Sequence, residues 1–271
     1  MTGTMPSVRR AACCKICGAA SAPFGSARVL GRYDVQYYQC PACRFVQTET
    51  PYWLDEAYGT PLIAADTGAV DRNLHLAAIS QTVIQHFFDE EATFLDYGGG
   101  YGLFVRLMRD RGFDFRWYDR YARNLHAIGF DASPNDDAFQ LVTAFEVLEH
   151  LVDPGRELPM MLPPSAAALL CTTRLLPAAN PKPGDWWYYA PSGGQHVSLY
   201  SLDSLRVLAG RMSCYLASDG VALHLFSRRP ISERVFQFVT RRRVSALLNR
   251  VRRRESLVEA DFERMTGDRP R

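Results

Sequence analysis

The segment with the clearest chemistry is a turn in which glycines alternate with other residues directly after an acid. It reads D-x-G-x-G-x-G, from Asp96 through Gly98 and Gly100 to Gly102, and it follows an apolar run. Glycine permits the positive φ of a tight turn and lets a ligand approach the backbone. A phosphate-binding loop has other spacings, and an acid here would repel a pyrophosphate. The acid suits an ammonium group, which indicates S-adenosylmethionine (SAM), a nucleoside that carries an amino acid and a sulfonium.

Two further segments follow at spacings typical of a doubly wound sheet. Residues 115–119 read as a strand that ends in Asp119, 23 residues after Asp96. A carboxylate that binds ribose hydroxyls belongs about 20 residues downstream of the glycine turn. Residues 140–150 form an apolar strand that runs into an acidic helix start. The three segments together predict an α/β nucleotide-binding domain.

These segments resemble motifs of the class I SAM-dependent methyltransferases. Residues 96–102 are similar to the first motif of that family, residues 117–119 to the second and residues 139–154 to the fourth. The resemblance covers about residues 94–229 and implies a doubly wound, mostly parallel, seven-stranded sheet of the Rossmann-like type. It also implies a set of residues that bind the cofactor, namely Asp96, Gly98, Gly100, Gly102, Asp119 and Glu146.

The general base has two competing candidates. The first is His196, because residues 196–201 resemble the H-x-S-x-Y-S stretch of sugar-modifying methyltransferases, where this histidine is the proposed base. An imidazole suits the deprotonation of a sugar hydroxyl or of a carbon next to a carbonyl. The second is the group Glu146, Glu149 and His150, since a similar segment in quinone-type O-methyltransferases can bind a divalent metal that polarises the acceptor. Either set could instead be structural.

A long loop rich in Pro, Gly and aromatic residues, 174–195, follows the fifth predicted strand. A loop at the carboxyl end of a strand lies over the ligand crevice in such sheets. Tyr188 and Tyr189 are candidates to orient the acceptor, and Tyr189 is included among the catalytic residues. Trp186 and Trp187 could stack on a sugar ring or pack the loop.

Four cysteines form two C-x-x-C pairs, Cys14 with Cys17 and Cys40 with Cys43. Two such pairs complete the tetrahedral shell of a structural zinc ion, and their spacing is close to that of a zinc ribbon. Cys13 could replace Cys14 in the shell, although the spacing favours Cys14. Two disulfides are the alternative, and they would need an oxidising compartment that nothing in the sequence indicates.

The remaining elements follow from periodicity and composition. Residues 69–89 have helical periodicity and precede the first strand of the sheet, and residues 127–130 are the predicted third strand. Residues 228–254 contain ten arginines and one acid, with apolar residues at helical spacing, and predict one basic amphipathic helix. The last 17 residues turn more acidic and are expected to be mobile.

The domain division predicted for the 271 residues has five parts. These are a disordered N-terminus (1–12), a zinc ribbon (13–48), a linker and leading helix (49–92), a SAM-binding domain (93–229) and a basic helical tail (230–271). No apolar run reaches the length of a membrane span, and no secretory signal is evident, so we expect a cytoplasmic location. The basic tail leaves three readings open: a solvated helix on its own domain, peripheral attachment to an anionic membrane, or nucleic-acid contact.

A zinc ribbon before such a domain resembles the zinc-binding sugar methyltransferases of deoxysugar and surface-polysaccharide pathways. The resemblance implies methyl transfer from SAM to a hydroxyl of a sugar, a nucleotide-sugar or a glycan. Carbon-methylating members usually carry a further C-terminal domain, for which this chain is too short, so C-methylation is the weaker reading. Other readings are a small-molecule or quinone-type O-methyltransferase at a membrane surface, and a zinc-ribbon protein that binds nucleic acid. Against the last, no N/D-P-P-[YFW]-type segment follows the strand at 140–145.

Overall fold

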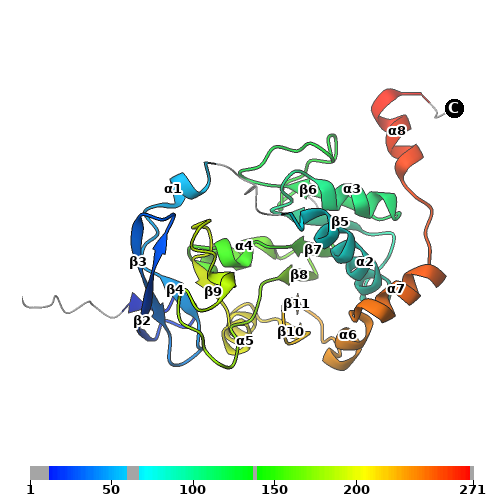
Figure 1. The fold of residues 1–271 in the computed structure, drawn as a ribbon. Coiled ribbons are helices and arrows are strands. Elements are labelled where there is room, and N and C mark those ends of the chain that lie inside the picture. Colours follow the sequence, from blue (N-terminus) through cyan, green and yellow to red (C-terminus); the bar gives the residue numbers. More distant parts are fainter. Residues whose placement is uncertain (1–11, 60–66, 137–138, 269–271) are drawn as a thin grey trace, which may run out of the picture.

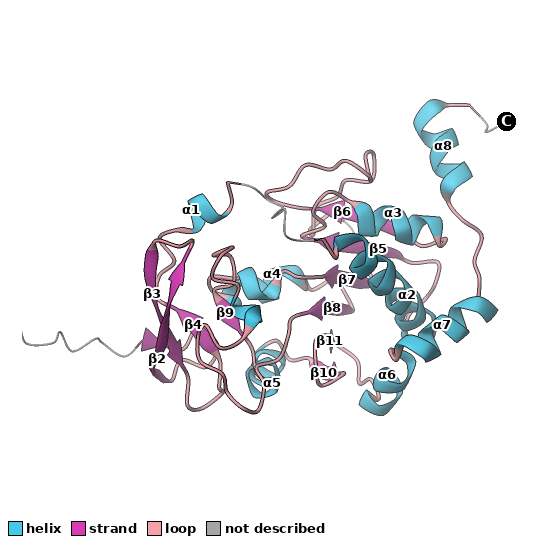
Figure 2. Cartoon of the chain, viewed as in Figure 1, coloured by secondary structure: helices cyan, strands magenta, loops and turns pink. Residues whose placement is uncertain are grey.

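The fold is known from a computed structural model, which describes residues 12–59, 67–136 and 139–268. Except for Ala12, the segment predicted to be disordered, 1–12, lies outside the described residues. Two sheets organise the described chain: a small one near the N-terminus, and a larger one with helices around it (Figures 1 and 2). None of the helices in the described ranges combines the length and apolarity needed to cross a bilayer.

The larger sheet has six strands in the order β10-β11-β8-β7-β5-β6 (Figure 1). Strands β6, β5, β7 and β8 are parallel, whereas β11 is antiparallel to both of its neighbours. The bounds are β5 (Thr93–Tyr97), β6 (Asp114–Tyr118), β7 (Leu141–Ala144), β8 (Ala168–Thr172), β10 (Tyr215–Ser218) and β11 (Leu223–Ser227). The predicted doubly wound, mostly parallel sheet is confirmed, but the predicted number of seven strands is wrong by one.

The strand that is absent from the described sheet is the predicted third one, residues 127–130. This segment forms turns, and only the next residue, Asp131, bridges to Trp117 of β6. Gly129 has φ +85°, which an extended strand does not allow. Only 20 residues separate Asp119 from Gln140, too few for a helix, a strand and their connections.

Residues along each central strand alternate between two apolar cores. In β5, Leu95 points into one core and Phe94 into the other, and in β8 Leu169 and Leu170 divide in the same way. Burial on both faces is typical of parallel strands. Helices α4 and α5 contribute to the first core, and α2, α3 and α6 contribute to the second. These helices are α2 (Ala69–Phe87), α3 (Leu103–Asp110), α4 (Pro154–Met161), α5 (Leu202–Arg211) and α6 (Glu233–Val239).

The smaller sheet is antiparallel and has five strands in the order β1-β2-β3-β4-β9. Four of them come from the predicted ribbon, namely β1 (Ala12–Cys13), β2 (Ala20–Val29), β3 (Tyr33–Gln39) and β4 (Val46–Thr48). The fifth, β9 (Ser198–Leu199), comes from the segment after the long loop and pairs with β4. The ribbon sheet therefore includes a part of the chain that we assigned to the SAM-binding domain.

Side-chain packing strengthens the attachment of the ribbon to the larger domain. The rings of Phe45 and Tyr200 lie 5.2 Å apart, and both side chains are fully buried. The Ser201 hydroxyl donates to the carbonyl oxygen of Cys43 at 2.7 Å. Ser201 also begins α5 through a capping box with Ser204. One serine thus fixes both the start of a helix and the second cysteine pair.

The basic tail forms two helices instead of the single predicted one. They are α6 and α7 (Arg242–Val251), and the chain breaks between them at residues 240–241. α7 packs along α2, where Asn249 donates to the carbonyl of Ala78 at 2.8 Å and accepts from Thr82 at 3.0 Å. The tail is therefore part of the helical layer over one face of the larger sheet (Figure 1).

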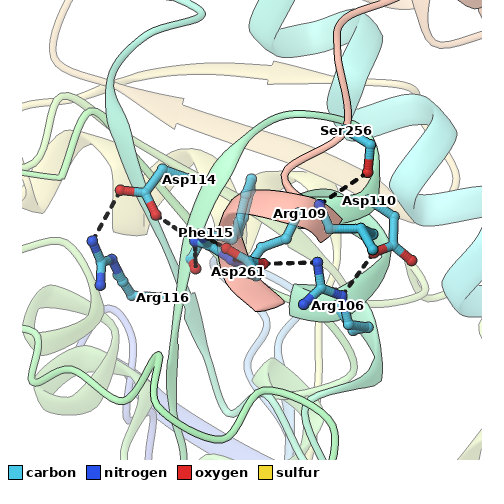
Figure 3. Close-up of polar contacts among 9 residues, drawn as sticks. Arg106, Arg109, Asp110, Asp114, Phe115, Arg116, Ser256 and Asp261 are labelled. Atoms are coloured by element: carbon cyan, nitrogen blue, oxygen red, sulfur yellow. Dashed lines mark hydrogen bonds and ion pairs between the residues drawn. The ribbon is translucent and has the colours of Figure 1, made fainter. Parts of the chain in front are cut away.

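The acidic end of the chain, which we expected to be mobile, forms helix α8 (Val258–Thr266) and is held by a buried ion pair. Asp261 accepts from Arg109 at 2.6 and 2.8 Å and pairs with Arg106 at 2.9 Å (Figure 3). Arg109 also bonds Asp114 and donates to the backbone oxygen of Phe115 on β6. Burial by itself would raise the pKa of Asp261, but the hydrogen bonds and charges of the two arginines lower it below the ordinary value.

Replacing Asp261 by alanine should destabilise the fold by about 2 kcal/mol, because it leaves part of the buried Arg109 charge without a partner. Asp110→Ala is the matched control, since its pair with Arg106 is exposed and contributes a few tenths of a kcal/mol at most. Urea denaturation of both variants measures the difference. Because the folded pKa of Asp261 is lowered, its contribution is present above about pH 4 and is lost as the pH falls through the folded pKa. Equal stability of the two variants would contradict the role of this ion pair.

Candidate functional site

The glycine turn lies between β5 and α3 and is held against the end of β6. The backbone N–H groups of Gly98 and Gly99 donate to the carbonyl oxygen of Tyr118 at 2.8 and 3.1 Å. Gly98, Gly100 and Gly102 have φ of +72°, +52° and +85°, which other residues adopt only at a cost. A Cβ at Gly100 would meet nothing within 4 Å, so the turn is open at its centre.

Asp119 fixes the other side of the turn, directly after β6. One carboxylate oxygen accepts from the N–H of Gly100 at 2.9 Å. The other accepts from the N–H groups of Tyr121 and Ala122, both at 2.7 Å. The oxygen bonded to Gly100 keeps a second lone pair, so these bonds orient the carboxylate and leave that oxygen able to accept from a ribose hydroxyl.

Asp96 is buried at the end of β5 and lies directly under the turn. One oxygen accepts from the Thr143 hydroxyl at 2.7 Å, and a Cβ at Gly99 would lie 2.8 Å from the other. Burial raises the pKa of Asp96 to about 7, while the Thr143 hydrogen bond opposes the shift. A buried carboxyl with a free oxygen beside a glycine turn fits an ammonium group, because a nearby cation would favour its charged form. The turn, Asp96 and Asp119 therefore suit the amino-acid and ribose parts of SAM.

His196 lies together with two of the three residues of the competing set, Glu149 and His150. Ligand atoms of Glu149, His150 and His196 are all within 4.8 Å of one another. Glu149 and His150 belong to a short 3-10 helix, η1 (Leu148–His150), which follows β7. The N–H of Val197 donates to the carbonyl of Glu149 at 2.9 Å and ties the segment of His196 to η1.

His196 has a defined tautomer. Its Nδ1 lies 2.6 Å from the carbonyl oxygen of Tyr188, and because a carbonyl only accepts, Nδ1 carries the proton. The neutral ring then has its lone pair on Nε2. Burial lowers the pKa of His196, although the hydrogen bond to Tyr188 opposes the shift. A neutral imidazole whose Nε2 has no hydrogen-bond partner among the described residues is a proton acceptor.

Glu149 and His150 are both held in their uncharged forms. Glu149 is fully buried, which raises its pKa to about 8, and the nearby charge of Glu146 adds to the shift. Burial, followed by the proximity of His196, lowers the pKa of His150 to about 3. One oxygen of Glu149 accepts from the Tyr188 hydroxyl at 2.7 Å, and the other is buried without a hydrogen-bond partner among the described residues. This orphaned oxygen leaves room for one more partner in the cluster.

Glu146, predicted to bind the cofactor, lies between the turn and the cluster. It adopts φ +56°, and a mutual pair of hydrogen bonds with Thr172 at 2.8 and 2.9 Å holds this conformation. A Cβ at Gly98 would lie 2.7 Å from a methyl of the next residue, Val147. The segment that carries Glu149 and His150 therefore lies directly against the glycine turn.

The tyrosine in the cluster is Tyr188, not Tyr189 as we predicted. Both belong to a second 3-10 helix, η2 (Trp187–Tyr189), where successive side chains point in different directions. Tyr189 is directed toward the ribbon: its hydroxyl donates to the carbonyl of Pro181 at 3.0 Å, and its ring meets Tyr37 edge-on. The sequence named both tyrosines as candidates on a loop, and the structure brings only Tyr188 into contact with Glu149.

Sequence reasoning missed Tyr58, which links the two halves of the site. Tyr58 follows α1 (Leu54–Ala57) and stacks on Tyr121, next to Asp119. Its hydroxyl lies 3.2 Å from Nδ1 of His150. No motif marks this residue, because its role depends on how the segment after the ribbon crosses the site.

A divalent metal was predicted at Glu146, Glu149 and His150. The side chains that converge are instead Glu149, His150 and His196, while one oxygen of Glu146 accepts from Thr172. One carboxylate and two imidazoles are ligands that several divalent metals accept. The donor set fits such an ion, with His196 in place of Glu146.

The four predicted zinc ligands converge as expected. All four sulfurs lie within 4.8 Å of one another, with 3.6 Å between Cys14 and Cys43 and 3.4 Å between Cys17 and Cys40. Sulfurs around a zinc ion at about 2.3 Å would lie about 3.8 Å apart, so the group fits a tetrahedral ion. Cys13, the alternative ligand, is exposed, and none of the cysteines is in a disulfide.

A family model described as a methyltransferase domain matches residues 70–216. The chain belongs to this methyltransferase family. The match includes the glycine turn, Asp119, the cluster residues Glu149 and His150, and the long loop. It begins after the ribbon, and it ends before the residues of β11 and the three C-terminal helices.

Several solved structures resemble this methyltransferase. The structure of TnmH is 18% identical with a TM-score of 0.43, and the similarity covers 66% of this chain and 62% of that one. The plantazolicin methyltransferase BpumL, solved with a monoazolic desmethylPZN analog and SAH, is 12% identical with a TM-score of 0.46. The similarity covers 66% of this chain and 94% of that one. A putative methyltransferase in complex with the Haloferax volcanii Trm112 activator is 14% identical with a TM-score of 0.44. The similarity covers 67% of this chain and 98% of that one. No curated protein matches the chain.

Binding of SAM should release protons from Asp96, because an adjacent ammonium favours the charged carboxylate. With an unliganded pKa of about 7, the affinity should rise about tenfold between pH 5.5 and pH 7. Calorimetry in buffers of different ionisation enthalpy measures both the affinity and the protons released. Asp96→Asn should bind more weakly and lose the pH dependence.

Asp119→Asn is the matched control for this experiment. It should weaken binding through the ribose contact and keep the proton release, because Asp96 is intact. Binding by the wild type that is independent of pH over this range would show that the ammonium does not approach Asp96.

Proposed function

We propose that this methyltransferase uses SAM to methylate a hydroxyl of a sugar, a nucleotide-sugar or a glycan. The observation that carries the proposal is the position of His196, a neutral imidazole that lies with Glu149 and His150 in a cluster whose segment packs against the glycine turn through Val147. A hydroxyl becomes a useful nucleophile when a base removes its proton as the new bond forms. The stretch 196–201, which resembles that of sugar-modifying methyltransferases, supports a sugar acceptor.

The residues of the site have separate roles in this reaction. Asp96, the glycine turn and Asp119 would hold the donor, which supplies an electrophilic methyl group on a sulfonium when bound. His196 would accept the proton of the acceptor hydroxyl on Nε2, while its Nδ1 proton stays bonded to the carbonyl of Tyr188. That bond also stabilises the imidazolium that forms. Tyr188 and Glu149 position η2 and η1 around the imidazole.

A small-molecule or quinone-type O-methyltransferase is the second candidate. The observation that favours it is the orphaned oxygen of Glu149 in a group with His150 and His196, which fits a divalent metal. In that reading the metal would polarise the acceptor oxygen and His196 would be a ligand instead of the base. The two readings differ in whether turnover needs an added divalent ion.

Tyr188→Phe and Tyr189→Phe form a matched pair that tests the cluster. Each removes one buried tyrosine hydroxyl. The Tyr189 hydroxyl makes one hydrogen bond, to Pro181, whereas that of Tyr188 also bonds Thr173 and the N–H of Arg174, so the stability cost should be about 1 kcal/mol for Tyr189→Phe and larger for Tyr188→Phe. Only Tyr188→Phe leaves both oxygens of Glu149 without a hydrogen-bond partner among the described residues, and it should lower kcat by about 10- to 100-fold. The measurement is the rate of S-adenosylhomocysteine formation over a panel of nucleotide-sugars, glycans and phenols.

The same panel tests the proposed function itself. Turnover with a sugar acceptor, together with a kcat of Tyr189→Phe close to that of the wild type, is the expected result. Turnover with phenols alone would favour the second candidate. Equal losses in the two variants would remove the cluster from the catalytic machinery.

We also propose that α6 and α7 attach the protein to an anionic membrane surface. Six exposed arginines on or beside these helices form no ion pair among the described residues, namely Arg234, Arg241, Arg242, Arg243, Arg250 and Arg253. Exposed apolar side chains accompany them, with Phe238 54% exposed, Leu247 63% and Val251 78%. Basic helices with exposed apolar residues bind anionic bilayers through both kinds of contact.

The double variant Arg242→Ala with Arg243→Ala should bind phosphatidylglycerol-containing vesicles with an affinity about 30-fold lower, as measured by co-sedimentation. The reason is that each arginine near such a surface contributes about 1 kcal/mol of binding free energy. The double variant Arg156→Ala with Arg206→Ala is the control, since these exposed arginines lie on α4 and α5 over the other core. The wild type and both double variants should all bind neutral vesicles weakly. Salt-dependent binding to duplex DNA without vesicle binding would support the nucleic-acid reading instead.

A further inference from the structure

A cavity of about 450 Å³ lies between the ribbon, the long loop and the start of α5. Its lining includes Arg44 of the second cysteine pair, Arg174 and Trp187 of the loop, and residues 201–203. No residue of the glycine turn lines it, nor do Asp96 and Asp119. It is therefore a separate space from the site that fits SAM.

Arg44 lines this cavity and has a strained backbone conformation. Arg44 follows Cys43 as Gly18 follows Cys17. The N–H of Gly18 donates to the carbonyl oxygen of Cys14 at 2.9 Å, and the N–H of Arg44 donates to the carbonyl oxygen of Cys40 at 2.8 Å. Both residues are left-handed, with φ +79° at Gly18 and +56° at Arg44. Glycine adopts this conformation freely, whereas arginine does not. Strain of this kind at a cavity wall points to a use for the side chain.

Arg174 supplies a second cation to the cavity. It is half-buried, directly follows the strand end at residues 172–173, and its guanidinium lies 5.5 Å from the ring centre of Trp187. Neither Arg174 nor Arg44 takes part in an ion pair among the described residues. The one carboxylate in the lining, Asp203, pairs with Arg206 at 3.1 Å. Two half-buried cations thus face the cavity with little local compensation.

The cavity adjoins the catalytic cluster through two successive hydrogen bonds. The N–H of Arg174 donates to the Tyr188 hydroxyl at 3.1 Å, and that hydroxyl donates to Glu149 at 2.7 Å. Trp187, which is 70% exposed, is the neighbour of Tyr188 in η2. A ligand in the cavity would therefore lie next to the residues that surround His196.

We propose that this cavity binds the diphosphate of the acceptor, with Arg44 and Arg174 on its oxygens and Trp187 available to stack on an attached ring. Guanidinium groups recognise phosphate oxygens through paired hydrogen bonds, and two of them match the charge of a diphosphate better than that of a single carboxylate. The inference rests on the proposed function and narrows it. The acceptor is a nucleotide-sugar, and a neutral glycan is excluded.

Calorimetric titration of the zinc-replete protein, saturated with S-adenosylhomocysteine, tests the proposal with pyrophosphate, uridine diphosphate and thymidine diphosphate as probes. The wild type should bind at least one nucleoside diphosphate with a Kd below 1 mM, more tightly than pyrophosphate because of the stacking on Trp187. Arg44→Gly and Arg174→Ala should each raise that Kd about tenfold or more. Arg156→Ala, an exposed arginine of α4, should change it less than twofold.

Arg44→Gly should not unfold the protein, because glycine already occupies the equivalent position after the first cysteine pair, at Gly18. A loss of binding in this variant would therefore reflect the lost side chain. The variant's thermal stability should equal or exceed that of the wild type. Equal affinities in the wild type and both cavity variants, or no diphosphate binding by the wild type, would overturn the proposal. Binding of S-adenosylhomocysteine in the same samples separates the two hypotheses. If it is intact while diphosphate does not bind, only the subsite is wrong. If it is absent while the variants still lose diphosphate binding, the subsite stands and the proposed SAM-dependent reaction fails.

Discussion

The pairing of β4 with β9 is the constraint on which the candidate site depends. Two residues of each strand, Val46 opposite Leu199 and Gln47 opposite Ser198, join the ribbon to the segment that begins at His196. The hydroxyl of Ser198 then donates to the carbonyl of Leu151 at 2.6 Å, just beyond η1. The segment of His196, the base candidate, is therefore held both by the ribbon, through β4, and by the residues after η1, through Leu151. A ribbon of this size has little core of its own, so the metal that its cysteines fit would stabilise the whole arrangement.

The cluster of Glu149, His150 and His196 shows why such support is needed. A fully buried glutamate beside two half-buried histidines destabilises the fold unless the groups are neutral and hydrogen-bonded. Glu149 reaches that state by a raised pKa and His150 by a lowered one, and Tyr188 satisfies one oxygen of the acid. The remaining oxygen has no partner among the described residues, which marks the cluster as a place for another group. Contacts from the surrounding structure must hold such groups in place. Glu146, next to the cluster, has a strained backbone with a positive φ and also depends on such contacts.

Local motifs carried most of the sequence-based prediction. The glycine turn, Asp119 and the cysteine pairs could be recognised because their chemistry requires fixed residue types at fixed spacings, and the mostly parallel sheet followed from them. What failed depended on contacts between distant segments. The choice between Tyr188 and Tyr189 depends on the direction of each side chain in η2, and the recruitment of β9 by the ribbon has no local signature. Tyr58 meets His150 only because the chain crosses the site after the ribbon. The predicted third strand failed for a local reason, since the turn-forming residues around Gly129 outweighed the apolar ones.

The absence of a third strand explains the packing of α8, which the composition of the last residues did not indicate. Without that strand, β6 is the edge of the described sheet, and an edge exposes backbone groups that must find other partners. Part of that demand is met by Phe130 and Ala132, whose backbone groups bond both polar groups of Trp117. Another part is met by Arg109, which donates to the carbonyl of Phe115 and stacks over the ring of Phe130. Buried there, the guanidinium needs a counter-charge, and Asp261 of α8 supplies it. A shortened connection in the nucleotide-binding half thus accounts for why the acidic end of the chain is helical and packed.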